Sequence, residues 1–282
     1  KFSTRNPNYN NSDKAVFTNI QSFETDRLAD FGYKTNKTGI TIGTDFEYYD
    51  DLTLGLGFNS YYENITTDST ASSQQQKLKG NYFDNFISLS LDYDKRNQKF
   101  QTSQGFRNYL STDLPLISET NTLANTIITT NYYEYFNNNI LKSSFYFRNA
   151  NSITGENVKL SERLSLPSNR LRGFERGKVG PKDGNDFIGG NYIASLNFSS
   201  DVPKILENSQ ATDLKIFLDI ANVWGVDYDS TLETSEDIKS AIGIGLDWFT
   251  PIGPLNFTLS QHLSKGSNDI TESFRFNLGT TF

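Results

Sequence analysis

The stretch Leu255-Asn256-Phe257-Thr258-Leu259-Ser260 decides the fold class of this chain. Every odd residue in it is apolar and every even residue is polar, which is the two-residue period of a β-strand with unlike faces. The closing stretch has the same period, because Phe274, Phe276, Leu278 and Phe282 alternate with polar or small residues. The C-terminal end is therefore predicted to form strands with one apolar face each.

The same alternation recurs along the whole chain. Ile42, Leu56, Leu89 and Ile244 each belong to an alternating apolar set, and no segment shows an equally sustained helical period. We predict twelve main strands, at 15–23, 38–49, 52–62, 84–94, 104–114, 125–136, 140–150, 190–199, 213–224, 239–249, 254–263 and 272–282. Residues 2–7 are interpreted as the tail of a thirteenth strand. The chain is thus predicted to be all-β.

Composition excludes several classes of site. Cysteine is absent and histidine occurs once, so disulfides and His- or Cys-rich metal centres are not expected, and we predict no metal and no cofactor. The net charge of −7 argues against nucleic acid as a partner. We find no catalytic constellation and do not expect an enzyme. Because the chain starts at Lys1 and contains no Met, we expect it to be a piece of a longer product.

Hydropathy does not settle whether the chain meets a membrane. The mean hydropathy is −0.54, and no run of about 18 apolar residues could cross a bilayer as a helix. Transmembrane β-barrels escape this test because only alternate residues face lipid. Aromatic residues make up 14% of the chain, which suits the interfacial girdles of such barrels.

The connections between strands are predicted to alternate in length. Tight turns follow the second, sixth and tenth predicted strands. Polar excursions follow the odd strands, at 24–37, 63–83, 115–124, 151–189, 225–238 and 264–271. Outer-membrane barrels have short periplasmic turns and long external loops, so we expect the C-terminus on the periplasmic side.

A soluble β-sandwich or propeller is the alternative all-β architecture. The polar face is rich in Gly, Ser, Thr and Asn rather than in charges, and the strands run about ten residues, the bilayer-crossing length, where sandwich strands run about five or six. Both features favour an antiparallel transmembrane β-barrel.

Ordered motifs in residues 161–282 resemble those of the BamA-type outer-membrane protein assembly factors, in the POTRA-domain outer-membrane superfamily. The blocks are Leu171-Arg172-Gly173-Phe174, Val179-Gly180-Pro181, Gly189-Gly190-Asn191, Phe217-Leu218-Asp219, Gly243-Ile244-Gly245, Pro251-Ile252-Gly253-Pro254 and the stretch from Phe274 to Phe282. Residues 1–160 match only in strand pattern.

The resemblance implies a barrel of about sixteen strands behind periplasmic POTRA domains. We therefore expect residues 1–282 to be one outer-membrane barrel domain of a Gram-negative bacterium that lacks its POTRA domains and its first strands. The expected partners are outer-membrane lipid, unfolded β-barrel precursors and accessory assembly lipoproteins held by the absent POTRA domains. We expect residues 15–23 and 272–282 to be the two open edges of the sheet, with no hydrogen-bonded ladder between them.

The implied function is folding and insertion of β-barrel precursors into the outer membrane. Two alternatives stay open. One is a TamA-like or two-partner-secretion transporter of the same superfamily, and the other is a passive diffusion porin.

The resemblance also implies the site residues. Arg172, Gly173 and Phe174 form the motif of a long loop, 151–189, that folds into the barrel. Asp219, on one strand face with Phe217, is the expected partner of Arg172, and Asn197 stands where the family has a second acid. Breaking such a pair costs about 3–5 kcal/mol when it is dry, whereas an exposed pair is worth about 0–1. Because we expect the lumen to contain water, we expect the cost of breaking this pair to lie in the lower part of that energy range. The terminal residues Phe274, Phe276, Leu278, Gly279 and Phe282 resemble the β-signal of outer-membrane proteins.

Overall fold

The computed structural model describes residues 1–99, 101–135, 139–202, 212–250 and 253–278. Thirteen strands form one antiparallel sheet in the order β1-β2-β3-β4-β5-β6-β7-β8-β11-β12-β13-β14-β15. They are β1 (Phe2–Asn6), β2 (Lys14–Arg27), β3 (Tyr33–Tyr49), β4 (Leu52–Thr67), β5 (Gly80–Asp94), β6 (Gly105–Ser118), β7 (Thr122–Tyr135), β8 (Asn139–Ser152), β11 (Tyr192–Asp201), β12 (Thr212–Trp224), β13 (Lys239–Thr250), β14 (Gly253–Ser264) and β15 (Phe274–Leu278). A separate hairpin consists of β9 (Lys182–Asp183) and β10 (Asp186–Phe187). The prediction of an all-β antiparallel fold is confirmed.

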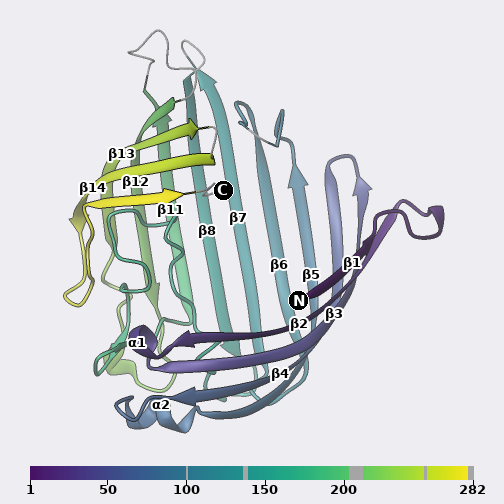
Figure 1. Ribbon diagram of the computed structural model, residues 1–282, viewed down its shortest axis with the longest axis vertical. Helices are drawn as coiled ribbons and strands as arrows, with labels where there is room; N and C mark the ends of the chain where they lie inside the picture. The colour runs from purple at the N-terminus through teal and green to yellow at the C-terminus, as the bar shows by residue number, and fades with distance from the viewer. Residues whose placement is uncertain (100, 136–138, 203–211, 251–252, 279–282) are drawn as a thin grey trace.

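The sheet curls around an enclosed side (Figure 1). Strands β5 to β8 form one wall, with β1 to β4 and β11 to β15 bending round on either side of it. No helix in the described part of the chain is long and apolar enough to cross a membrane.

The outer face of the sheet is apolar, as the alternation predicts. Aligned pairs such as Leu56 with Leu89, and Ile244 with Leu259, stand on this face. All the side chains that we expected to face lipid are exposed: Ile42, Leu56, Leu89, Ile244, Leu259 and Phe276. Since they share no buried core, the sandwich alternative is excluded.

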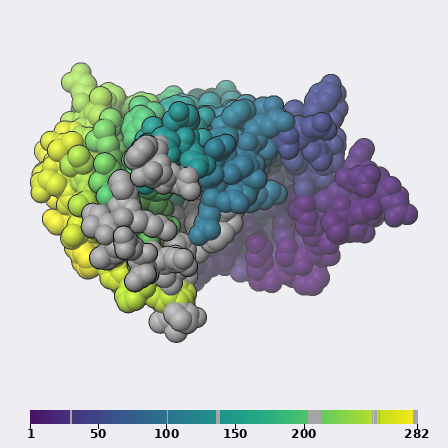
Figure 2. Space-filling model, turned by 90° about the horizontal axis from the view of Figure 1, so that it is seen from above, coloured from purple at the N-terminus to yellow at the C-terminus, as the bar shows by residue number. Residues whose placement is uncertain are grey.

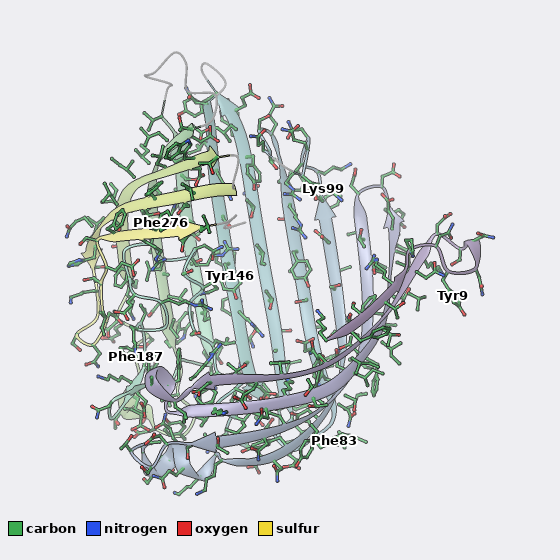
Figure 3. The ribbon with its side chains drawn as sticks, viewed as in Figure 1. Tyr9, Phe83, Lys99, Tyr146, Phe187 and Phe276 are labelled. Atoms are coloured by element: carbon green, nitrogen blue, oxygen red, sulfur yellow. The ribbon has the colours of Figure 1, made fainter. Side chains whose placement is uncertain are left out.

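The buried core lies instead between the enclosed face and the long connection from β8 to β11. Its members come from both: Tyr146, Ala150, Val158, Leu164, Leu166, Leu171, Phe174, Val179, Ile193, Ala221, Val223 and Ala241. Figure 3 locates Tyr146 on β8 and Phe276 on the last strand. The connection therefore replaces water on part of the inner wall. We call residues 153–191 the inward loop.

The three longest connections, 153–191, 225–238 and 68–79, lie at one end of the sheet, together with α1 (Leu28–Phe31) and α2 (Ser73–Lys77) (Figure 1). Three predicted excursions are shorter than expected, because β2 to β7 continue into 24–37, 63–83 and 115–124. Polar residues sustain these extensions by cross-strand contacts, such as Lys34 with Glu24 at 2.7 Å and Asn64 with Asn81 at 2.7 Å. A polar stretch was wrongly taken as the end of the strand.

The two ends of the sheet lie far apart. Within the described residues, β1 pairs with β2 and β15 pairs with β14, and no ladder joins β1 or β2 to β15. Figure 2 shows the first strands (purple) and the last strands (yellow) on opposite sides of the molecule. The predicted absence of a ladder with 15–23 is confirmed for the described part of the terminal strand, up to Leu278. Residues 15–23 are not themselves the edge, however, because β1 covers Val16 to Ile20.

Candidate functional site

The inward loop closes on itself and then lies against the inner wall. An antiparallel bridge joins Leu164 to Gly190 across the base of the loop. At its far end Gly173 adopts a φ of +89°, and a Cβ there would stand 3.1 Å from the Ala241 Cβ and 3.2 Å from Ser260. Glycine is required at this position by both its backbone conformation and its close approach to β13 and β14.

Arg172 and Asp219 meet as the loop motif predicts. The Arg172 Nε and Nη2 each donate to one Asp219 oxygen at 2.8 Å, and the Arg172 backbone N–H donates to Oδ2 at 3.0 Å. The Asp219 side chain is fully buried and that of Arg172 is 24% exposed. The pair is therefore drier than we expected of a wet lumen, because the loop itself excludes the water.

Two further predicted residues complete this contact. The Arg172 guanidinium lies 3.6 Å from the centre of the Phe217 ring, a cation–π geometry. The Asn197 amide donates to Asp219 Oδ1 at 2.9 Å and to the Arg170 carbonyl at 2.7 Å. Asn197 thus links the buried carboxylate to the loop backbone, which an acid at that position could not do by donation.

A second buried charge cluster, not predicted from the sequence, anchors the start of the loop. Lys159 is fully buried and contacts Glu63 of β4 at 3.0 Å, Asp84 of β5, and Glu162 at 3.2 Å. The Glu63 and Asp84 side chains are only 2% and 4% exposed. Two acids on the inner faces of neighbouring strands were a visible signal, but nothing in the sequence indicated which cation meets them.

A third anchor, also missed, lies between these two. Arg163 pairs with Asp227 and donates to the Asn191 side chain at 3.0 Å. The other Asp227 oxygen accepts from the Val158 backbone N–H at 2.7 Å. Three cations of one loop, Lys159, Arg163 and Arg172, therefore bind acids outside that loop.

The described part of the stretch that resembles a β-signal forms the edge strand β15. Phe274, Phe276 and Leu278 are exposed on the outer face and pair with Leu259, Phe257 and Leu255 of β14. Gly279 and Phe282 lie outside the described residues. In the part of the chain that the structure describes, β15 has a strand partner on one side only.

In the described residues, the site consists of ion pairs, a cation–π contact and hydrogen bonds to the backbone, all of which fix the position of the inward loop. No group of three or more His, Asp or Glu in that part of the chain is arranged to hold a metal ion. What the arrangement can do is hold a loop rigidly inside a curled sheet with an open edge.

The model of the Omp85 superfamily domain matches residues 1–282. The outer membrane protein assembly factor BamA of Neorickettsia risticii is 23% identical over 256 residues, which are 89% of this chain and 34% of that protein. The chain thus spans about a third of the length of this curated relative.

Two solved structures share the fold. BamA from Haemophilus ducreyi lacking POTRA domains 1–3 aligns with a TM-score of 0.88 at 20% identity, over 97% of this chain and 60% of that one. CdiB from Acinetobacter baumannii aligns with a TM-score of 0.54 at 11% identity, over 94% of this chain and 47% of that one.

Proposed function

This chain belongs to the Omp85 superfamily, and we propose that it is the barrel portion of an outer-membrane assembly factor that folds and inserts β-barrel precursors. At the level of the family, the matched relatives support outer-membrane protein assembly in Gram-negative bacteria. The insertase role and its partners are our proposal.

The observation that supports the role is a sheet edge beside a lipid-facing band. Lipid cannot satisfy backbone N–H and C=O groups, so a precursor strand needs a partner before it enters the bilayer. An unpaired strand edge supplies that partner by β-augmentation. Phe274, Phe276 and Leu278 are exposed on the outer face of β15, which supports an edge that meets lipid. No covalent bond is made or broken, so the proposed function needs no catalytic residue.

We place the end that carries the inward loop outside the cell and the short turns, with the C-terminus, in the periplasm. POTRA domains on the periplasmic side would then receive precursors and accessory lipoproteins. This orientation lets an arriving precursor meet β15 from the side on which it is delivered.

The test uses the full-length protein, whose barrel portion contains no cysteine. A cysteine replaces Phe276 on β15 or, as a matched control, Leu141 in the middle of the sheet on β8; both side chains are exposed outward. The probe is an outer-membrane barrel precursor with one cysteine in its own terminal strand, added to liposomes that contain each variant. We expect disulfide capture at Phe276→Cys and little at Leu141→Cys. Equal capture at both positions contradicts the proposal.

A secretion transporter of the same superfamily is the second candidate, because the CdiB fold is shared. A transporter or an open porin must clear its lumen, whereas three ion pairs, each with at least one fully buried side chain, hold the inward loop here. Conductance in planar bilayers and precursor insertion separate the candidates. A large stable pore without insertion would favour the transporter or the porin, and insertion of the precursor without such a pore favours the insertase.

A further inference from the structure

The inward loop is bonded to the terminal hairpin as well as to the inner wall. Phe174 forms an antiparallel bridge with Thr271, in the connection between β14 and β15. The Glu175 N–H donates to the Ile270 carbonyl at 2.9 Å, and the Glu272 N–H donates to the Gly173 carbonyl at 3.0 Å. The motif residues of the loop thus pair directly with the segment that leads into β15.

Arg275, on the inner face of β15, makes this junction continuous with the edge strand. Its Nη1 donates to the Ser168 carbonyl at 2.9 Å and its Nη2 to the Phe174 carbonyl at 2.6 Å. Its Nε donates to Glu272 Oε1 at 2.5 Å. If Arg275 contacted only Glu272, the two would form an ordinary local ion pair. The Arg275 guanidinium instead also binds two loop carbonyls, of Ser168 and Phe174, that are six residues apart in the sequence.

The opposite end of the loop is fixed to the far wall. Lys159 binds Glu63 on β4 and Asp84 on β5, in the first half of the sheet. The inward loop therefore spans from β4 and β5 to β15. No ladder joins the two ends of the sheet in its described part, so this cross-brace connects the terminal strand to the N-terminal half by a shorter path than the continuous sheet.

We propose that Arg275 is a positioning residue that ties the terminal strand to the inward loop and so sets where its open edge stands. The consequence for precursor addition rests on the function proposed above. The contact between Arg275 and the inward loop does not rest on that function, because it is present in the protein without any precursor. Charge-assisted hydrogen bonds to carbonyls shielded from water resist the opening of this junction. Among the described residues, five of β15 pair with β14, on one side of the strand.

The experiment measures the position of the edge without any precursor. Spin labels are attached to cysteines replacing Phe276 on β15 and Leu141 on β8 in the full-length, otherwise cysteine-free barrel, and their separation is measured by pulsed electron resonance. We expect one narrow distance with Arg275 and a second, displaced population with Arg275→Gln. The ratio of displaced to resting molecules should rise at least about tenfold, the factor for one lost charge-assisted hydrogen bond. Arg275→Lys should restore part of the resting population.

The matched control is Arg107→Gln on β6. Arg107 also makes a bidentate ion pair on the inner face, with Asp92, but contacts no part of the inward loop in the hydrogen bonds and ion pairs of the described residues. We expect its distance distribution to match that of the parent. An unchanged distribution in Arg275→Gln, or equal broadening in Arg107→Gln, overturns the proposal.

Folding and function are separated by two further measurements. Should Arg275→Gln not fold, Glu272→Gln keeps the arginine but removes its carboxylate partner, and a smaller shift in the same direction is expected; no shift overturns the proposal. Insertion of the precursor is then assayed for each variant. A displaced edge with undiminished insertion overturns the positioning role. If the parent itself inserts nothing, the proposed function fails, while the distances still decide whether Arg275 ties the strand.

Discussion

Arg172 and Asp219 form a pair whose strength depends on the water that the loop excludes. The carboxylate is fully buried and accepts four hydrogen bonds, three from Arg172 and one from Asn197. A buried pair gains little over an apolar substitute, but removing one partner leaves a charge without compensation. The pair therefore specifies where the loop sits more than it adds to stability.

At the residue scale we predict the effect of exchanging these charges. Arg172→Asp and Asp219→Arg should each lower the free energy of unfolding by about 3–5 kcal/mol, because each places like charges together in a dry site. The double variant should recover part of this loss. The measurement is urea-induced unfolding in lipid bilayers. A double variant no more stable than the weaker single one would show that the contact is not a charge pairing.

A second residue-scale prediction concerns Asn197. Its amide donates to Asp219 and to the Arg170 carbonyl, so Asn197→Asp replaces two donated bonds with a negative charge facing two acceptors. We expect destabilisation of about 1–3 kcal/mol in the same unfolding assay. Asn197→Asp combined with Asp219→Asn leaves one acid in the site and should regain most of it. Stability of the single variant equal to the parent would mean that Arg172 can serve both acids.

At the element scale, the inward loop is held to the sheet by ion pairs of its own cations, Lys159, Arg163 and Arg172. The ion pairs of Lys159 persist over a wide pH range. Burial alone would lower the pKa of Lys159, but Glu162, Glu63 and Asp84 outweigh it and raise the pKa above the ordinary 10.5. A raised folded-state pKa means that the stabilisation is complete below pH 10.5 and is lost only as the pH rises beyond it.

We therefore predict that Lys159→Met frees the start of the loop at neutral pH. Glu63 and Asp84 would be left buried without a counter-charge, at a cost of about 3–5 kcal/mol. Added protease should then cut within residues 151–189, which stay protected in the parent up to about pH 10. Changing Glu63→Gln and Asp84→Asn in the Lys159→Met chain should restore protection. Continued cleavage there would assign the effect to lost packing rather than to charge.

Some of these loop contacts could be predicted from the sequence and others could not. The pairing of Arg172 with Asp219 could be predicted, because a recognisable loop motif and an acid on an inward strand face both stand in the sequence. Lys159 with Glu63 and Arg275 with Ser168 could not, since each joins segments about a hundred residues apart with no periodicity to relate them. Alternation fixes which face a residue occupies, but not which loop residue comes to meet it.

At the scale of the whole molecule, the sheet presents two different surfaces to two different solvents. Leu54, Leu56, Leu89 and Leu91 point outward, while Ser88 and Ser90 lie between them on the enclosed side. The alternation that produces this division is plain in the sequence, and the strand positions were predicted from it. The contacts of the inward loop with β4, β5 and β15 do not follow from it.

The division predicts opposite outcomes for neighbouring substitutions. Leu89 lies near the middle of β5, exposed on the outer face beside Leu56, so Leu89→Arg puts a charge into the hydrocarbon. We expect a loss of about 2–4 kcal/mol in unfolding free energy, the range for an arginine near the bilayer midplane.

Ser90→Arg is the matched control one residue along. Ser90 faces inward between Gly55 and Ser111, where the opposing side chains are small and the new guanidinium stays out of the lipid, so we expect a loss below about 1 kcal/mol. Both values come from urea unfolding in bilayers of matched thickness. If Ser90→Arg costs as much as Leu89→Arg, the outer face is not the lipid face, and the sheet would have to be placed differently with respect to the membrane.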